Sequence, residues 1–117
     1  MIRSYPHELS GGMLQRAMIA QALLGDPALL IADEMTSSLD VSVQAALVRM
    51  LKTLNMERNM SILFVTHDIA LAASFADRMI VLHQGVCVDE GVARDVIRSP
   101  HHEYTMRLIE STRLCLR

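Results

Sequence analysis

The sequence has few cysteines, no long apolar run and no cluster of basic residues, and each scarcity excludes a class of protein. Cys87 and Cys115 are its only cysteines, they lie far apart, and no signal peptide precedes them. We therefore expect a cytosolic chain with two free thiols. The longest apolar stretches are far shorter than the ~20 residues that a helix needs to cross a bilayer. The chain should not be integral to a membrane, although it could dock onto a membrane protein.

The charge pattern gives no sign of a nucleic-acid surface. The formal net charge is −2, charges of both signs are interspersed, and no run of five basic residues occurs, which also argues against a polybasic membrane patch. Apolar residues make up 51% of the 117 residues and charged residues 21%. This composition and length predict one globular domain with a modest core.

Apolar residues at helical spacing predict a helix that starts after Ser10 and stops at Gly25-Asp26-Pro27. A second helix is expected from Val41 to Glu57 and a third from Ile69 to Ala76. The apolar positions expected to face the core are Leu14, Ala17, Met18, Leu23 and Leu24 in the first helix, and Val43, Leu47, Met50, Leu51 and Leu54 in the second.

Three short runs without a polar residue alternate with these helices, at residues 28–32, 62–65 and 79–82. Such runs are typical of strands buried on both faces of a parallel sheet. Gln84-Gly85 predicts a turn, after which Val86 to Asp89 pairs back as a hairpin, and two short helices are expected near 92–98 and 104–114.

The order of elements indicates an α/β domain built from crossover units. Three parallel strands are few for a doubly wound sheet, so we expect further strands to lie N-terminal to this sequence. Left without them, the three strands would present apolar surface and an unpaired edge, which predicts poor solubility or self-association.

The first group of residues with chemical potential is Leu9-Ser10-Gly11-Gly12-Met13, followed by Gln15 and Arg16. A helix N-terminus attracts phosphate through its unsatisfied N–H groups, and glycines let a ligand approach the backbone closely. The alternative is an ordinary capped helix with a flexible start.

The second group is the acid pair Asp33-Glu34, which directly follows an apolar strand. Ligands of open α/β sheets bind beyond the carboxyl ends of the strands. An aspartate there can hold Mg²⁺, and a neighbouring glutamate can polarise a water for attack on a phosphoryl group. The alternative is that the two acids only cap the next turn.

The third group is Thr66-His67-Asp68, again at the end of an apolar strand. If the two strands are neighbours, His67 faces the same crevice as Asp33 and Glu34 and could contact a terminal phosphate. A histidine in this position is alternatively a surface or capping residue.

Together these groups resemble the motifs of the ABC ATPase family, in their order and spacing. Residues 9–13 are similar to its signature motif, 29–34 to its Walker B strand and 37–40 to its D-loop, and His67 is similar to its switch histidine. Met13 and the tail residues His102, Tyr104 and Thr105 resemble the oligopeptide, dipeptide and nickel importer branch.

The resemblance implies a partial P-loop NTPase (ABC ATPase) fold with three or more parallel strands, flanking helices and a C-terminal hairpin. It implies that residues 1–117 are the C-terminal part of one nucleotide-binding domain. Its expected parts are a signature helix at about 1–25, a core with Walker B, D-loop and switch histidine at 26–91, and C-terminal helices at 92–117.

The resemblance also implies roles at ATP sites that form between two ATPase subunits. Asp33 would organise Mg²⁺, Glu34 would be the general base and His67 would reach the γ-phosphate. Six further residues would contact the nucleotide held by the partner subunit or lie at the dimer seam: Ser10, Gly11, Gly12, Met13, Gln15 and Asp40.

The same resemblance implies ATP and Mg²⁺ as cofactors, and a second ATPase subunit and integral membrane permeases as partners. The chain would act peripherally at the cytoplasmic face of the membrane as the energy-coupling part of a peptide or nickel importer. One alternative is a non-catalytic module that lends its signature face to a partner ATPase. Another is an ABC ATPase of translation or DNA repair, against which the importer-type tail argues.

Two departures from the family pattern bear on function. No glycine-rich loop ending in Gly-Lys-Ser or Gly-Lys-Thr occurs in the sequence, and that loop supplies the N–H cradle and the lysine for the phosphates. Met35 stands where the family usually has proline, which would pre-set the turn after the acid pair.

We predict that the isolated chain has negligible ATPase activity, because phosphoryl transfer depends on positioning by the absent cradle. The measurement is steady-state phosphate release from purified chain with Mg-ATP. Turnover that Glu34→Gln abolishes would overturn this prediction.

Overall fold

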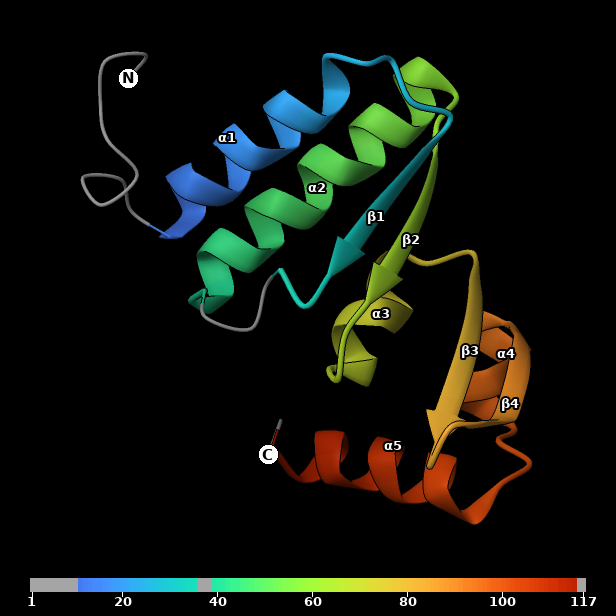
Figure 1. The fold of residues 1–117 in the computed structure, drawn as a ribbon. Coiled ribbons are helices and arrows are strands. Elements are labelled where there is room, and N and C mark those ends of the chain that lie inside the picture. The colour runs from blue at the N-terminus through green and yellow to red at the C-terminus, as the bar shows by residue number, and fades with distance from the viewer. Residues whose placement is uncertain (1–10, 36–38, 116–117) are drawn as a thin grey trace. The chain divides into compact units, whose positions relative to one another are not determined.

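The computed structural model describes residues 11–35 and 39–115 and divides the chain into two compact units, residues 1–66 and 67–117 (Figure 1). The single nucleotide-binding domain and its expected parts, at about 1–25, 26–91 and 92–117, stay predictions.

The first unit contains two helices and two strands: α1 (Gly11–Leu23), β1 (Leu29–Asp33), α2 (Val41–Arg58) and β2 (Ser61–Val65). Helix α1 ends before Asp26, which has a left-handed φ of 48°. Helix α2 begins at the N-cap Asp40 and ends at Asn59, whose φ of 51° is also left-handed. Helices commonly stop at such a residue, because it turns the chain away from the helix axis.

Strands β1 and β2 pair in parallel, with Leu29 opposite Ser61 and Asp33 opposite Val65. Both helices lie along one side of this pair (Figure 1). The core of the unit combines one residue of α1, one of β1, two of α2 and one of the loop before β2: Ile19, Leu30, Leu47, Leu51 and Met60.

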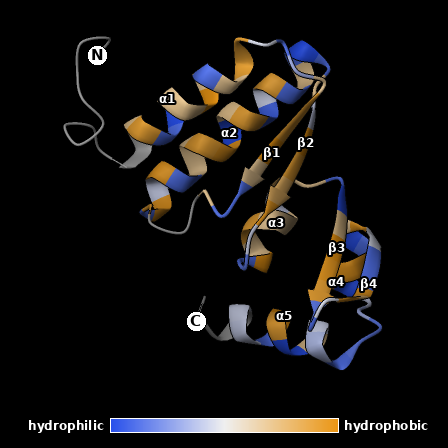
Figure 2. Cartoon of the chain, in the orientation of Figure 1, coloured by the Kyte–Doolittle hydropathy of each residue, from blue (hydrophilic) through white to orange (hydrophobic). Residues whose placement is uncertain are grey.

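The other side of the β1–β2 pair is apolar and exposed. Figure 2 colours both strands as largely hydrophobic. We call this side the outer sheet face and define it by Leu29, Ile31, Leu63 and Val65, which are 42–62% exposed. Burial on both faces, which the apolar runs indicated, does not occur in this pair. The exposed apolar surface expected for the strands without further neighbours is confirmed.

The predicted stripe of α2 is confirmed in Leu47 and Leu51, which are buried together with Val48. The stripe predicted for α1 is wrong in part, because Met18 is 56% and Leu24 is 87% exposed. Ile19, which was not among the predicted core positions, is the buried residue of that helix among residues 13–23, whose burial is described.

The second unit is a hairpin with three helices: α3 (Ile69–Phe75), β3 (Arg78–His83), β4 (Val86–Val92), α4 (Ala93–Arg98) and α5 (Glu103–Cys115). Gln84 and Gly85 both have positive φ, 51° and 79°, which is the geometry that two-residue hairpin turns require. The core residues come from all three helices and from the hairpin: Ile69, Met79, Val81, Ala93, Val96 and Ile109.

The α/β class and the C-terminal hairpin are confirmed, but the third parallel strand is a correction. Within the described part of the chain, β3 pairs only with β4, and it does so antiparallel. The predicted turn at 84–85 brings β4 back along one edge of β3. An apolar run indicates a buried strand but not the direction in which that strand pairs, which is why the sequence did not distinguish this strand from the first two. Across residues 11–35 and 39–115, no helix has the length and apolar character needed to cross a bilayer.

We predict that the outer sheet face drives self-association, because its exposed aliphatic side chains lie beside strand edges that pair with no other strand of the described residues. Replacing the register partners Ile31 and Leu63 by threonine keeps β propensity while removing apolar area. The double variant should show a smaller mass than the native chain in analytical ultracentrifugation.

The matched control is Met56→Gln on α2, where the native methionine is 74% exposed. This change removes exposed apolar surface from a helix and should leave the association state unchanged. A monodisperse native monomer, or an equal effect of the control, would contradict the prediction.

Candidate functional site

The acid pair lies at the carboxyl edge of the β1–β2 pair. Asp33 is the last residue of β1 and pairs in register with Val65, the last residue of β2. The next backbone N–H, that of Glu34, donates to the Val65 carbonyl oxygen at 2.8 Å. Both acidic residues are exposed. The sequence prediction of two carboxylates at a strand end is therefore confirmed in position.

Asp33 and Glu34 differ in their backbone conformation at this edge of the sheet. Alternation along β1 places Asp33 on the outer sheet face with Leu29 and Ile31. Glu34 has a φ of 53°, a left-handed conformation that is uncommon outside glycine, asparagine and aspartate. The chain thus turns sharply directly after the strand, with the turn tied to β2 by the Glu34 hydrogen bond.

His67 follows β2 by two residues and is exposed. It is the first residue of the second unit, so the predicted common crevice of His67 with Asp33 and Glu34 stays a prediction. The next residue, Asp68, is the N-cap of α3, where its carboxylate accepts the Leu71 N–H at 3.1 Å.

Asp40 is exposed and caps α2. Its Oδ1 accepts the Val43 N–H at 2.9 Å and the Ser42 hydroxyl at 3.0 Å. The pKa of Asp40 lies below its usual value, chiefly because of the Val43 N–H and then because of the Ser42 hydroxyl. This capping role was not predicted, although an aspartate directly before a helix is its ordinary signal.

The residues of the signature-like motif open α1. Gly11 and Gly12 are its first two residues, Met13 is 40% exposed and Gln15 is half-buried. Ser10 lies outside the described residues, as do Ser37 and Ser38 of the D-loop-like segment. The described part fits a phosphate ligand, because a helix N-terminus offers backbone N–H groups.

The donor set also fits Mg²⁺. No three His, Cys, Asp or Glu side chains gather as a metal group among residues 11–35 and 39–115. Mg²⁺ needs fewer protein ligands, since one or two carboxylates with phosphates and waters satisfy it. The exposed carboxylate of Asp33 is a donor of this kind.

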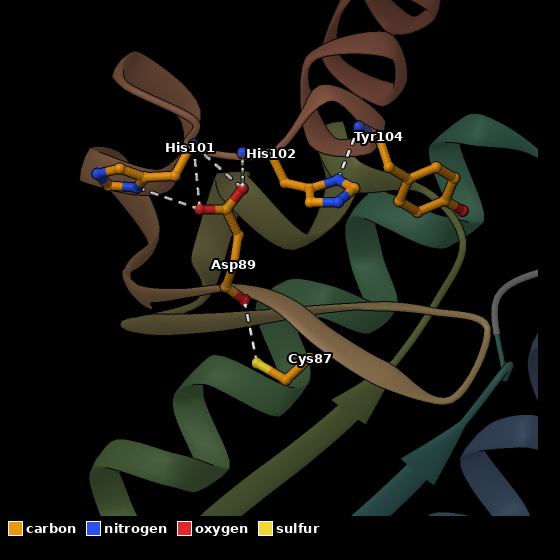
Figure 3. Close-up of polar contacts among 5 residues, drawn as sticks. All are labelled: Cys87, Asp89, His101, His102 and Tyr104. Atoms are coloured by element: carbon orange, nitrogen blue, oxygen red, sulfur yellow. Dashed lines mark hydrogen bonds and ion pairs between the residues drawn. The ribbon is translucent and has the colours of Figure 1, made fainter.

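A second polar cluster joins β4 to the segment before α5 (Figure 3). We call it the Asp89 cluster, and its residues are Cys87, Asp89, His101, His102 and Tyr104. Asp89 is 5% exposed. Its carboxylate accepts the His101 N–H at 3.1 Å and the His102 N–H at 3.0 Å, and it lies 3.2 Å from His101 Nδ1. The Cys87 thiol lies 3.6 Å from the Asp89 carbonyl oxygen.

The importer-like tail residues belong to this cluster. His102 Nδ1 accepts the Tyr104 N–H at 3.0 Å, and the Tyr104 ring stacks on His83 of β3 at 4.0 Å between centroids. Thr105 is fully buried. These contacts hold the start of α5 against the hairpin. No sequence pattern around Asp89 predicts them.

Hydrogen bonds decide the protonation of Asp89. Burial alone would raise its pKa, but Thr105 and the backbone N–H groups of His102 and His101 outweigh that effect and lower the pKa to about 2. The backbone N–H groups of His101 and His102 form hydrogen bonds with the Asp89 carboxylate. The Thr105 hydroxyl forms no hydrogen bond of good geometry.

Comparison with known proteins agrees with the motifs. The profile of the family described as ABC transporter matches residues 1–37. The dipeptide transport ATP-binding protein DppD of Haemophilus influenzae is 50% identical over 107 residues, which are 92% of this chain and 32% of that protein. The chain is related to the ATP-binding proteins of ABC transporters.

The glutathione import ATP-binding protein GsiA of Escherichia coli K12 is 46% identical over 109 residues, or 93% of this chain and 18% of that protein. The chain therefore spans about a third or less of the length of these two relatives. Their names include dipeptide and glutathione but not nickel, so nickel stays a prediction.

Solved structures show the same fold. The dimeric bacterial ABC transporter cassette MJ0796 matches with a TM-score of 0.66 and 39% identity over 76% of this chain and 38% of that chain. An inward-facing ABC transporter matches with a TM-score of 0.77 and 25% identity over 91% of this chain and 41% of that one. The α/β arrangement is thus that of ABC cassettes.

We predict that Asp89→Asn lowers the unfolding free energy by about 1–3 kcal/mol at neutral pH, because an amide cannot accept every N–H that the buried carboxylate accepts. Folding lowers the pKa of Asp89 from 3.8 to about 2. Its contribution is therefore complete above about pH 4 and is lost as the pH falls toward 2.

Denaturation monitored by circular dichroism at several pH values measures both effects. The loss of stability between pH 4 and pH 2 should be smaller in Asp89→Asn than in the native chain. Glu110→Gln, at an exposed carboxyl of α5, is the control. Identical pH profiles for the native chain and Asp89→Asn would rule out this role of the carboxylate.

Proposed function

We propose that the chain is part of an ATP-hydrolysing, energy-coupling subunit of an ABC importer for peptides. The observation that carries the proposal is the acid pair at the carboxyl edge of two paired parallel strands, with Glu34 bonded to β2. The dipeptide and glutathione names of the two relatives support the substrate class.

Asp33 and Glu34 perform different tasks in this proposal. Asp33 would hold Mg²⁺, directly or through water, and the bound ion would supply positive charge beside the phosphates. Glu34 accepts a proton from the attacking water as general base. Both carboxylates are exposed at the strand ends, where a nucleotide can reach them.

The signature-like residues act on the nucleotide of the partner subunit. Gly11 and Gly12, the first two residues of α1, would meet its γ-phosphate, with Met13 and Gln15 on the first turns beside them. Ser10, which lies outside the described residues, is proposed to take part in the same contact. The phosphate would be stabilised by the N–H groups and the positive dipole end of the helix. This role leaves the partner's phosphate loop to hold the same nucleotide from the other side.

Two further residues have roles in this proposal. His67 would reach the γ-phosphate and the partner's D-loop, and Asp40 would lie at the dimer seam. Asp40 already caps α2, so a contact at the seam would be transmitted to that helix. A second ATPase subunit and membrane permeases are the partners, and the chain acts peripherally at the cytoplasmic face of the membrane.

A second candidate is a non-catalytic module that lends its signature face to a partner ATPase. It requires only the N-terminus of α1, where Gly11 and Gly12 are the first two residues. In that case Ser10, Gly11 and Gly12 keep their role, while Asp33 and Glu34 perform no chemistry.

A chimera separates the two candidates. The matching 107 residues of the Haemophilus influenzae relative are replaced by this chain, and steady-state ATP hydrolysis is measured. We predict turnover in the chimera and a loss of about 10²–10⁴-fold in kcat on Glu34→Gln, the range for removing a general base.

Met56→Gln, at an exposed position of α2, is the matched control and should leave turnover unchanged. A folded chimera without turnover would contradict the catalytic proposal. If the unmodified chain then stimulated hydrolysis by the intact relative in a manner lost on Ser10→Arg, the non-catalytic module would replace it.

A further inference from the structure

His102 forms hydrogen bonds on both sides of the junction between β4 and α5 (Figure 3). Its backbone N–H donates to Asp89 Oδ2 at 3.0 Å. Its carbonyl oxygen accepts the Met106 N–H at 3.1 Å, and its ring Nδ1 accepts the Tyr104 N–H at 3.0 Å. An N-cap residue has this geometry, since its carbonyl accepts the first helical bond while its side chain accepts an N–H of the first turn. His102 therefore caps α5 with its imidazole ring.

The cap fixes where the ring of His102 carries its proton. An imidazole nitrogen accepts a hydrogen bond only through a lone pair, so a neutral ring that accepts at Nδ1 has its proton at Nε2. Imidazolium has an N–H at both nitrogens and can only donate. Protonated His102 would turn an N–H toward the Tyr104 N–H, and the cap would be lost. His102 is exposed, so protons reach the ring from solvent.

Charged and titratable residues lie on β3, on β4 and on both sides of His102 along the chain: His83, Asp89, His101, Glu103, Tyr104 and Arg107. The carboxylates favour imidazolium, whereas the positive dipole end of α5 and a protonated His83 disfavour it. None of these charges replaces the lone pair that the cap needs. The pKa of Asp89 is about 2, and the hydrogen bond from Arg107 lowers the pKa of Glu103. Both carboxylates therefore stay charged between pH 8 and pH 5, where imidazole ordinarily titrates.

The cap also holds an aromatic contact between α5 and the hairpin. Tyr104, whose N–H the cap accepts, stacks on His83 of β3 with 4.0 Å between ring centroids. The ring of His83 lies 6.4 Å from the ring of His102. Loss of the cap would loosen the first turn of α5, and this turn positions the ring of Tyr104.

We propose that His102 is a pH-sensitive cap, which fastens the start of α5 to the β3–β4 hairpin when its ring is neutral and releases it when the ring is protonated. Only the neutral ring can accept the Tyr104 N–H, so the start of α5 is held at high pH and is released as the pH falls through the range in which imidazole takes up a proton. This device lies within the second unit and needs no role in ATP hydrolysis.

Nitrogen-15 nuclear magnetic resonance of the full chain, with labelled histidine, tests the position of the proton at pH 8. We expect Nδ1 of His102 to resonate as an unprotonated ring nitrogen and Nε2 as a protonated one. The opposite assignment, or an average of the two tautomers, would overturn the proposal, because a proton on Nδ1 excludes the Tyr104 hydrogen bond.

The hydrogen-exchange protection of the Tyr104 amide tests the release. After correction for the pH dependence of intrinsic exchange, it should fall about 2–30-fold between pH 8 and pH 5, which is the usual effect of removing an N-cap expressed as a ratio. The fall should coincide with the titration of the His102 ring signals in the native chain. An unchanged protection, or a fall that follows the ring signals of His83 or His101 instead, would overturn the proposal.

Three variants isolate the ring of His102. His102→Asn, whose amide oxygen caps helices without titrating, should keep the Tyr104 protection from pH 8 to pH 5. The matched controls are His83→Phe, which keeps an aromatic ring beside Tyr104, and His101→Asn at the neighbouring exposed histidine. Both controls should keep the native pH response. An equal fall in His102→Asn and the native chain, or loss of the response in either control, would overturn the proposal.

Discussion

The parallel pairing of β1 with β2 is the constraint on which the first unit and its site depend. The register places Asp33 opposite Val65, and the hydrogen bond from Glu34 extends the pairing one residue beyond the strand. Because side chains alternate along a strand, a shift of one residue would send Leu30 out of the core and Asp33 into it. Core burial and site geometry are thus set by the same register.

Carboxylates also stabilise both units, because they accept hydrogen bonds from backbone N–H groups at or just before the starts of helices. Asp40 and Asp68 do so at the N-caps of α2 and α3. Asp89 does so from β4, within the second unit, toward the segment before α5. Burial makes this last contact the most consequential, since a buried donor without an acceptor is costly.

The sequence predicted the α/β class, the elements to within a few residues, and the position of the acid pair, because apolar runs and stop signals are local. It did not predict which strand faces would be covered, since burial of Ile31 or Leu63 depends on layers outside the run itself. The third strand was predicted to be parallel because its apolar run resembles the first two, but such a run does not fix the direction of pairing, and β3 pairs antiparallel with β4. The role of Asp89 was not predicted, because its partners lie twelve and thirteen residues away.

The central claim is that pairing with β2 holds the Glu34 backbone at the strand end. A scalar coupling across the hydrogen bond from the Glu34 amide nitrogen to the Val65 carbonyl carbon tests it directly. We predict a measurable coupling together with slow exchange of the Glu34 amide with solvent. Absence of the coupling, with exchange as fast as in an unfolded peptide, would contradict the claim.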